Sequence, residues 1–169
     1  MNGREVVPLD VRLGIMADRV VFTLYQLQST KLAPEKLDVV ALQNAFEFMK
    51  RAQHGRNVIK GSLTSGNAVE MTSAFSHVLE ALAAIYRKKS EEEKQRINEQ
   101  GLDAFFSEYM NALDKVLAYV EQGSTDLNEE DISLLLEFFK NLREVALASS
   151  ASALEKVVIS KPRIIYAGS

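Results

Sequence analysis

Apolar residues recur every three to four positions along most of this chain, the spacing that brings side chains to one face of an α-helix. Only three prolines and eight glycines interrupt the pattern. It predicts an all-α protein, folded as an antiparallel up-and-down helical bundle of about five helices. The predicted helices cover residues 9–29, 34–53, 67–89, 91–122 and 129–156.

Capping signals support several of these boundaries. Ser90 and Glu93 have the spacing of a capping box, Gly123 suits a helix end, and Asn128 suits an N-cap before three acidic residues. Gly101 marks a point where the fourth helix can be interrupted. Residues 54–66 contain three glycines and no sustained period, which predicts the longest internal loop.

The C-terminal segment 157–169 has a different composition, with β-branched and aromatic residues around Pro162. This composition favours an extended tail over a further helix. The length of 169 residues fits a single domain. Within it we expect residues 1–32 to form an extra N-terminal helix, residues 33–150 to form the bundle core, and residues 157–169 to form the tail.

Two of the predicted helices carry apolar residues on two faces, one face more than a helix at the edge of a bundle needs. In residues 33–52 the first stripe is Leu37, Ala41, Ala45, Phe48 and Ala52, and the second is Val39, Leu42, Phe46 and Met49. In residues 128–149 the first is Ile132, Leu135, Leu136, Phe139, Leu142 and Ala146, and the second is Leu134, Phe138, Val145 and Leu147. Either these helices are central, or their second stripes form a surface that another chain covers.

Composition and charge narrow the function classes. The net charge of −3 argues against a nucleic-acid partner, whose binding depends on neutralising phosphates. The absence of cysteine excludes disulfides, thiolate catalysis and cysteine-ligated metals. No segment approaches the roughly 20 apolar residues of a membrane span, and the N-terminus lacks the pattern of a signal peptide, so we expect no membrane partner and a cytoplasmic location.

The sequence offers little material for a catalytic or metal site. It contains only two histidines, His54 and His77, and neither is preceded at three positions by the glutamate of a di-iron helix bundle. Phosphate-binding loops, zinc-protease motifs and nucleophile elbows are absent from the sequence as well. We therefore predict a protein that is not an enzyme, with no catalytic residue, cofactor or metal.

Three segments resemble the flagellin-specific export chaperone family in their order and pattern. The stretch APEKLDVVALQNAFEFMKRA at residues 33–52 is similar to the first bundle helix of the family. The stretch LDAFFSEYM at residues 102–110 and LLLEFFKNLREVA at residues 134–146 are similar to later helices. The resemblance implies a small cytoplasmic bundle that holds the C-terminal segment of flagellin and needs no catalytic residue.

Together the resemblance and the doubled stripes predict an apolar groove for an amphipathic helical segment of a partner protein. The predicted partner-binding residues are Val39, Leu42, Phe46, Met49, Leu134 and Phe138. One alternative is a homodimer that buries the same stripes. Another is a small-molecule sensor domain, with a cavity surrounded by Phe75, Phe105, Phe106, Tyr109 and Phe139.

Overall fold

The computed structural model describes residues 7–29, 37–60, 68–123 and 127–160, and these ranges form six α-helices without a strand. The helices are α1 (Leu9–Ser29), α2 (Val39–Lys60), α3 (Ala68–Arg87), α4 (Glu91–Gln100), α5 (Leu102–Gln122) and α6 (Glu129–Ser160). The all-α prediction is confirmed. The number of helices differs from five because the chain turns at Gly101, whose φ of 91° lies in a region that favours glycine.

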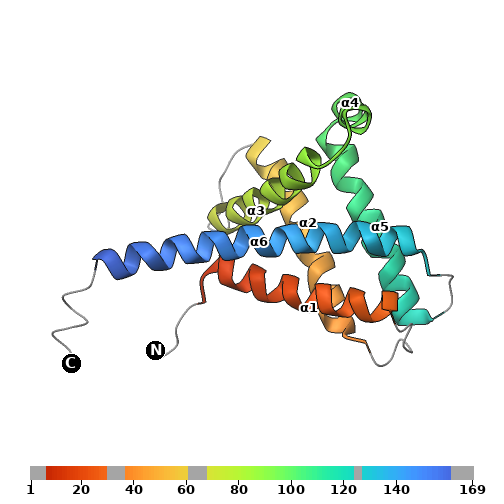
Figure 1. Cartoon of the computed structure of the whole chain (residues 1–169), viewed down its shortest axis with the longest axis horizontal. Coiled ribbons are helices and arrows are strands. Elements are labelled where there is room, and N and C mark those ends of the chain that lie inside the picture. Colours follow the sequence, from red (N-terminus) through yellow and green to blue (C-terminus); the bar gives the residue numbers. More distant parts are fainter. Residues whose placement is uncertain (1–6, 30–36, 61–67, 124–126, 161–169) are drawn as a thin grey trace.

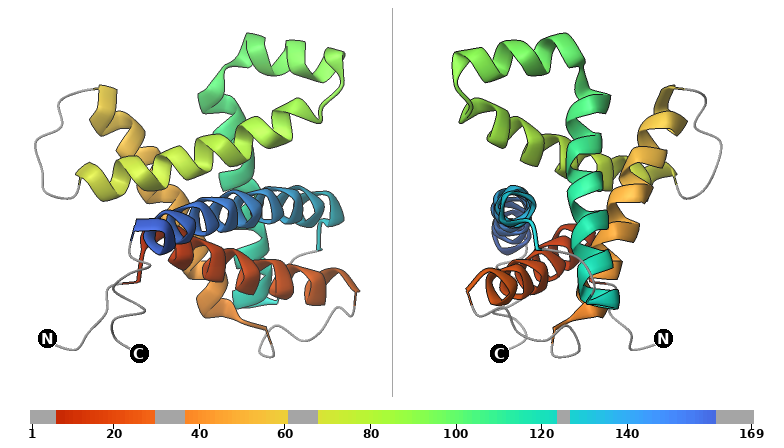
Figure 2. Two further views of the ribbon diagram at one scale, coloured as in Figure 1. Left: turned by 60° about the vertical axis from the view of Figure 1, so that its left-hand side comes forward. Right: turned by 90° about the vertical axis from the view of Figure 1, so that its right-hand side faces the viewer.

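The helices form two antiparallel pairs that cross each other steeply, rather than one bundle around a shared axis (Figures 1 and 2). In the first pair α1 runs against α6, so that Gly14 lies beside Leu147 near one end and Gln28 beside Ser133 near the other. In the second pair α2 runs against α5, while α3 packs on both α2 and α6. The N-terminal helix α1, which was expected to be an addition to the bundle core, is thus one of the two helices of the first pair.

The core lies where the two pairs cross. Its largest fully buried side chains are Leu24, Leu27, Leu42, Met49, Ile85, Tyr109, Leu113, Ile132, Leu135, Phe138, Phe139 and Leu142. They come from α1, α2, α3, α5 and α6, whereas α4 contributes none. Along the described ranges no helix combines the length and the apolar character needed to cross a membrane.

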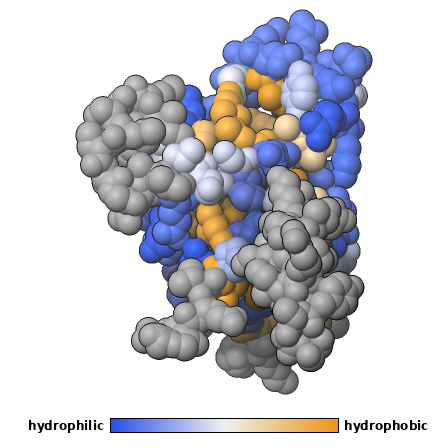
Figure 3. All heavy atoms as spheres, turned by 90° about the vertical axis from the view of Figure 1, so that its left-hand side faces the viewer, coloured by the Kyte–Doolittle hydropathy of each residue, from blue (hydrophilic) through white to orange (hydrophobic). Residues whose placement is uncertain are grey.

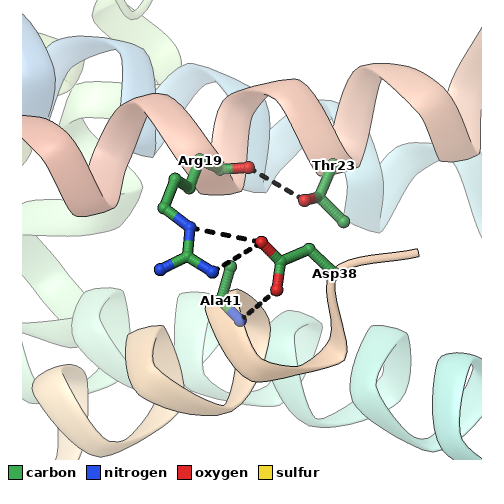
Figure 4. A network of polar contacts seen from close by, with 4 residues as sticks. All are labelled: Arg19, Thr23, Asp38 and Ala41. Atoms are coloured by element: carbon green, nitrogen blue, oxygen red, sulfur yellow. Dashed lines mark hydrogen bonds and ion pairs between the residues drawn. The ribbon is translucent and has the colours of Figure 1, made fainter.

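Asp38 begins α2 and ties it to α1 (Figure 4). Its Oδ1 accepts a hydrogen bond from the Ala41 backbone N–H at 2.9 Å, and its Oδ2 lies 2.7 Å from Nη2 of Arg19. The Ala41 N–H and the Arg19 guanidinium lower the pKa of Asp38, because both favour the ionised carboxylate. The sequence predicts a helix from residue 34, but residues 37 and 38 are not helical, so the prediction is wrong for these two. Residues 33–36 lie outside the described ranges.

The predicted loop at residues 54–66 is wrong in its first half, because α2 continues to Lys60. Gly55 is tolerated within the helix since α2 and α3 approach closely there. A Cβ at this position would lie only 3.1 Å from the Met71 carbonyl oxygen. Residues 61–66 lie outside the described ranges.

The predicted extended tail is also wrong where it can be compared, because residues 157–160 belong to α6. Val157, Val158 and Ile159 have a lower helix propensity than alanine, but the difference is only about 0.5 kcal/mol per residue. Extending an existing helix requires no new nucleus, so this cost is small. Residues 161–169 lie outside the described ranges.

Candidate binding cleft

The six predicted partner-binding residues are divided between the core and its edge. Leu42, Met49 and Phe138 are 0% exposed, so they contact only the chain itself, and their assignment to a partner surface is wrong in this structure. The reason is that α2 and α6 are central helices, as the first of the two interpretations of the doubled stripes supposes. Val39, Phe46 and Leu134 are half-buried and pack against the edge of the core.

These three half-buried residues do not form a common groove. Phe46 lines a hollow between α2 and α5 whose other side chains include Gln43, Glu47 and Glu121. Leu134 lines a separate hollow whose other residues are charged or polar. Charged and polar residues make up most of the lining of both hollows, so neither offers the continuous apolar surface that was predicted.

A more apolar cleft lies between α3, α4 and α5, with a volume of about 480 Å³. Its lining consists of Leu79, Leu82, Ala83, Tyr86, Ile97, Asn98, Gly101, Leu102 and Phe105. The four α3 residues have the spacing i, i+3, i+4 and i+7, so they form one stripe along the helix. We call this surface the α3–α5 cleft.

The cleft opens at the molecular surface. Ala83 and Leu102 are exposed, whereas Leu82 and Phe105 form its buried floor. Figure 3 shows hydrophobic surface running downward from beneath the hydrophilic residues at the top of the molecule, at the height of α4 in Figure 1. Hydrophilic residues border the upper part of this strip. The α3–α5 cleft can therefore accept an apolar group from solvent.

Helix α4 covers one side of the cleft without entering the core. Its single aliphatic side chain, Ile97, is half-buried and faces the cleft. Tyr86 Oη of α3 donates a hydrogen bond to Asn98 Oδ1 at 3.2 Å, and Lys94 Nζ lies 5.7 Å from the centre of the Tyr86 ring. The capping box predicted at Ser90 is confirmed and fixes the start of the helix.

The chemistry of the lining is that of a binding surface. Leucine, isoleucine, alanine and phenylalanine side chains bury apolar groups, and they carry no nucleophile, general base or metal ligand. The two polar side chains of the lining, Tyr86 and Asn98, bond to each other. The arrangement therefore favours recognition of apolar groups by contact area rather than by directed polar bonds.

The aromatic residues expected around a sensor cavity are buried, and three of them, Phe105, Tyr109 and Phe139, belong to a row of contacting rings that includes Phe138. The ring of Tyr109 lies 5.4 Å from Phe105 and 5.1 Å from Phe138, and Phe138 lies 4.9 Å from Phe139. These are the separations of rings in contact. The rings therefore fill the space between α5 and α6, and of the five expected residues only Phe105 reaches the α3–α5 cleft.

The two histidines lie apart from the cleft. His54 is exposed on α2, and His77 Nδ1 lies 2.8 Å from the Ser73 carbonyl oxygen, the distance of a hydrogen bond donated by the ring. Across the described ranges no group of three or more histidine, cysteine, aspartate or glutamate side chains is arranged to hold a metal ion.

Of the residues that line the cleft, only Phe105 was among the predicted site residues. The interruption expected at Gly101 turns the chain so that α4 covers only part of the α3 stripe, a consequence that the sequence pattern does not reveal. Comparisons of the chain with protein-family models, curated proteins and solved structures gave no match.

Proposed function

We propose that this chain is a non-enzymatic protein-binding module that holds an amphipathic helical segment of a partner protein in the α3–α5 cleft. The observation that carries the proposal is the apolar lining of an open cleft of about 480 Å³. A helix lays side chains spaced i, i+3, i+4 and i+7 into such a cleft, and burial of each leucine-sized side chain stabilises the complex by roughly 1.5–3 kcal/mol before the costs of association.

Charge complementarity favours a basic partner helix. Helix α4, at the rim of the cleft, carries four glutamates against one lysine and one arginine. Lysine or arginine residues beside the apolar row of a partner would therefore be attracted to this rim. The partner we propose is an amphipathic segment with basic flanks.

The resemblance to flagellin-specific export chaperones supports the same kind of function. It makes the C-terminal segment of flagellin a named candidate for the partner, and it implies that binding takes place in the cytoplasm. Such a chaperone acts by covering the apolar face of its client, so the proposal requires no cofactor or catalytic group.

A synthetic peptide tests the proposal directly. We expect a fluorescent peptide with leucines at helical spacing and lysines between them to bind, and a peptide of the same composition with scrambled order to bind weakly. Ala83→Arg, at an exposed position of the cleft, should lower the affinity by about tenfold or more, because it adds bulk and repels the basic peptide.

Ala148→Arg is the matched control, because Ala148 is exposed on α6 and the substitution adds the same charge outside the cleft. Its affinity should equal that of the wild-type chain in fluorescence anisotropy. Equal binding by the two arginine variants, or equal binding of the ordered and scrambled peptides, would refute the proposal. The same measurement with the C-terminal segment of flagellin tests that partner.

A small apolar molecule is a second candidate for the cleft, because about 480 Å³ falls in the range of ligand pockets. Tyr86 and Asn98 would be the polar groups that orient it. The two candidates differ in how large a molecule must be to bind with full affinity. Competition by a single aromatic compound with the affinity of the whole peptide would favour the small molecule over the helical segment.

A further inference from the structure

The outer face of α1 is a second apolar surface, on a different side of the molecule from the α3–α5 cleft. Ile15 and Phe22 are 55% and 64% exposed and stand two turns apart, and Tyr25 is 42% exposed beside them. Leu147 of α6 is 52% exposed and lies next to Gly14 of α1. We call these four exposed side chains the α1 face. In Figure 2 (right) α1 and α6 lie on the left side of the molecule, and α5 and α2 lie to the right of them.

We propose that the α1 face binds the α1 face of a second copy of this chain, in an antiparallel two-fold dimer. Asp18 and Arg19 lie between Ile15 and Phe22 in the sequence and carry opposite charges. A two-fold axis that passes midway between Asp18 and Arg19 places each of them opposite the other in the second copy. The same axis places Ile15 opposite Phe22, so one operation matches both charge and apolar contact.

The ion pairs within the chain are compatible with this arrangement. Asp18 Oδ1 lies 3.2 Å from Arg143 Nη1, and Arg19 Nη2 lies 2.7 Å from Asp38 Oδ2. The side chains of Asp18 and Arg19 nevertheless remain 57% and 49% exposed. A second copy would therefore extend these pairs into a network without breaking them.

The charge and the size of the face favour a second copy over a partner of strong charge. The ion pairs at the face, Asp18 with Arg143 and Arg19 with Asp38, join equal numbers of acidic and basic side chains. A balanced face meets its own copy without net repulsion. Helix α1, with 21 residues, is about 31 Å long. A stable interface buries ~800 Å² per partner, so α6 beside α1 would contribute to it as well.

The oligomeric state of the whole chain tests the proposal. We expect sedimentation equilibrium to show a dimer that dissociates on dilution, and Phe22→Asp to be a monomer at the same concentration. The control is Val40→Asp, since Val40 is 58% exposed on α2 outside the α1 face. This variant should remain a dimer, and circular dichroism should show unchanged helicity in both variants.

Charge reversal tests the two-fold axis. Asp18→Arg places two positive residues on each copy and Arg19→Asp places two negative residues, so each variant alone should be a monomer. A mixture of the two variants should form a heterodimer, because every facing pair is then opposite in charge. A mixture that stays monomeric, while the wild-type chain dimerises, would contradict the proposed axis.

Cysteine pairs test the orientation, because the chain has no cysteine of its own. A mixture of Ile15→Cys and Phe22→Cys should form a disulfide-linked heterodimer under mild oxidation. Phe22→Cys alone should not, since two such positions would lie about 10 Å apart along antiparallel helices, beyond the reach of a disulfide. Self-linking of Phe22→Cys would overturn the proposed orientation. A purified wild-type chain that is monomeric in sedimentation would overturn the dimer itself, and would leave the α1 face to a different protein.

Discussion

At the scale of single residues, Asp38 both caps α2 and pairs with α1. The side chain of Asp38→Asn keeps an oxygen acceptor for the Ala41 N–H but loses the charge that faces Arg19, while that of Asp38→Ala loses both. We expect Asp38→Ala to lower the free energy of unfolding at neutral pH by about 1 kcal/mol, and Asp38→Asn to lower it by less.

The effect of Asp38 should depend on pH with a definite sign. The folded state lowers the pKa of this carboxyl below its ordinary value of 3.8, so the ionised form stabilises the fold. That contribution is fully present above the ordinary pKa and is lost as the pH falls through the lowered value. In urea unfolding the difference between the wild-type chain and Asp38→Asn should therefore shrink progressively as the pH falls below 3.8. A difference that grows on acidification would contradict this assignment.

Tyr109 places a buried hydroxyl in the core, which costs stability. Its ring is fully buried among aromatic neighbours, and its hydroxyl has no hydrogen-bond partner among the described residues. Burial raises the pKa of Tyr109, so the hydroxyl stays neutral. Tyr109→Phe should therefore leave the free energy of unfolding unchanged or raise it by about 1 kcal/mol, because a buried unpaired hydroxyl is removed. Thermal unfolding measures this. A loss of stability would indicate a hydrogen bond to the hydroxyl.

At the scale of helices, two glycines inside α1 and α2 provide a matched comparison of packing. A Cβ on Gly14 would lie 3.7 Å from its nearest neighbour, an ordinary contact, whereas a Cβ on Gly55 would lie 3.1 Å from the Met71 carbonyl oxygen. Alanine improves a helix interior by roughly 0.5–1 kcal/mol. Gly14→Ala should therefore raise the free energy of unfolding. Gly55→Ala should lower it, because α2 and α3 must separate. Equal effects in thermal unfolding would show that the two helices adjust freely.

The same helices show how far sequence reasoning extends. The bounds of α1 were predictable because Pro8 and a single apolar stripe define them, and the start of α6 because Asn128 has capping chemistry. Asn128 Oδ1 indeed accepts the Glu130 N–H at 2.9 Å. The end of α2 was not predictable. In the sequence alone, Gly55 suggests that the helix ends there. Only the contact with Met71 of α3 explains why the helix needs a small residue at this position.

At the scale of the whole molecule, the position of the candidate site depends on which helices cover each other. The period of a helix reveals two apolar stripes on α2 but not that α1, α3 and α5 cover most of both of them. For the same reason the sequence could not show that part of the α3 stripe stays open beneath α4. The exposed side chains of Leu102 and Phe22 belong to α5 and α1 rather than to the two helices with doubled stripes, because the crossing of the two helix pairs decides which faces stay open.

The separation of the two surfaces leads to a final prediction. The α3–α5 cleft is formed by α3, α4 and α5, whereas the α1 face belongs to α1 and α6, so the two functions should be independent. Phe22→Asp should bind the amphipathic peptide with wild-type affinity while remaining a monomer, and Ala83→Arg should dimerise normally while binding the peptide weakly. Anisotropy and sedimentation on the same samples measure both properties. Loss of peptide binding in a folded Phe22→Asp variant would mean that the cleft is complete only in the dimer, because the substitution lies outside its lining.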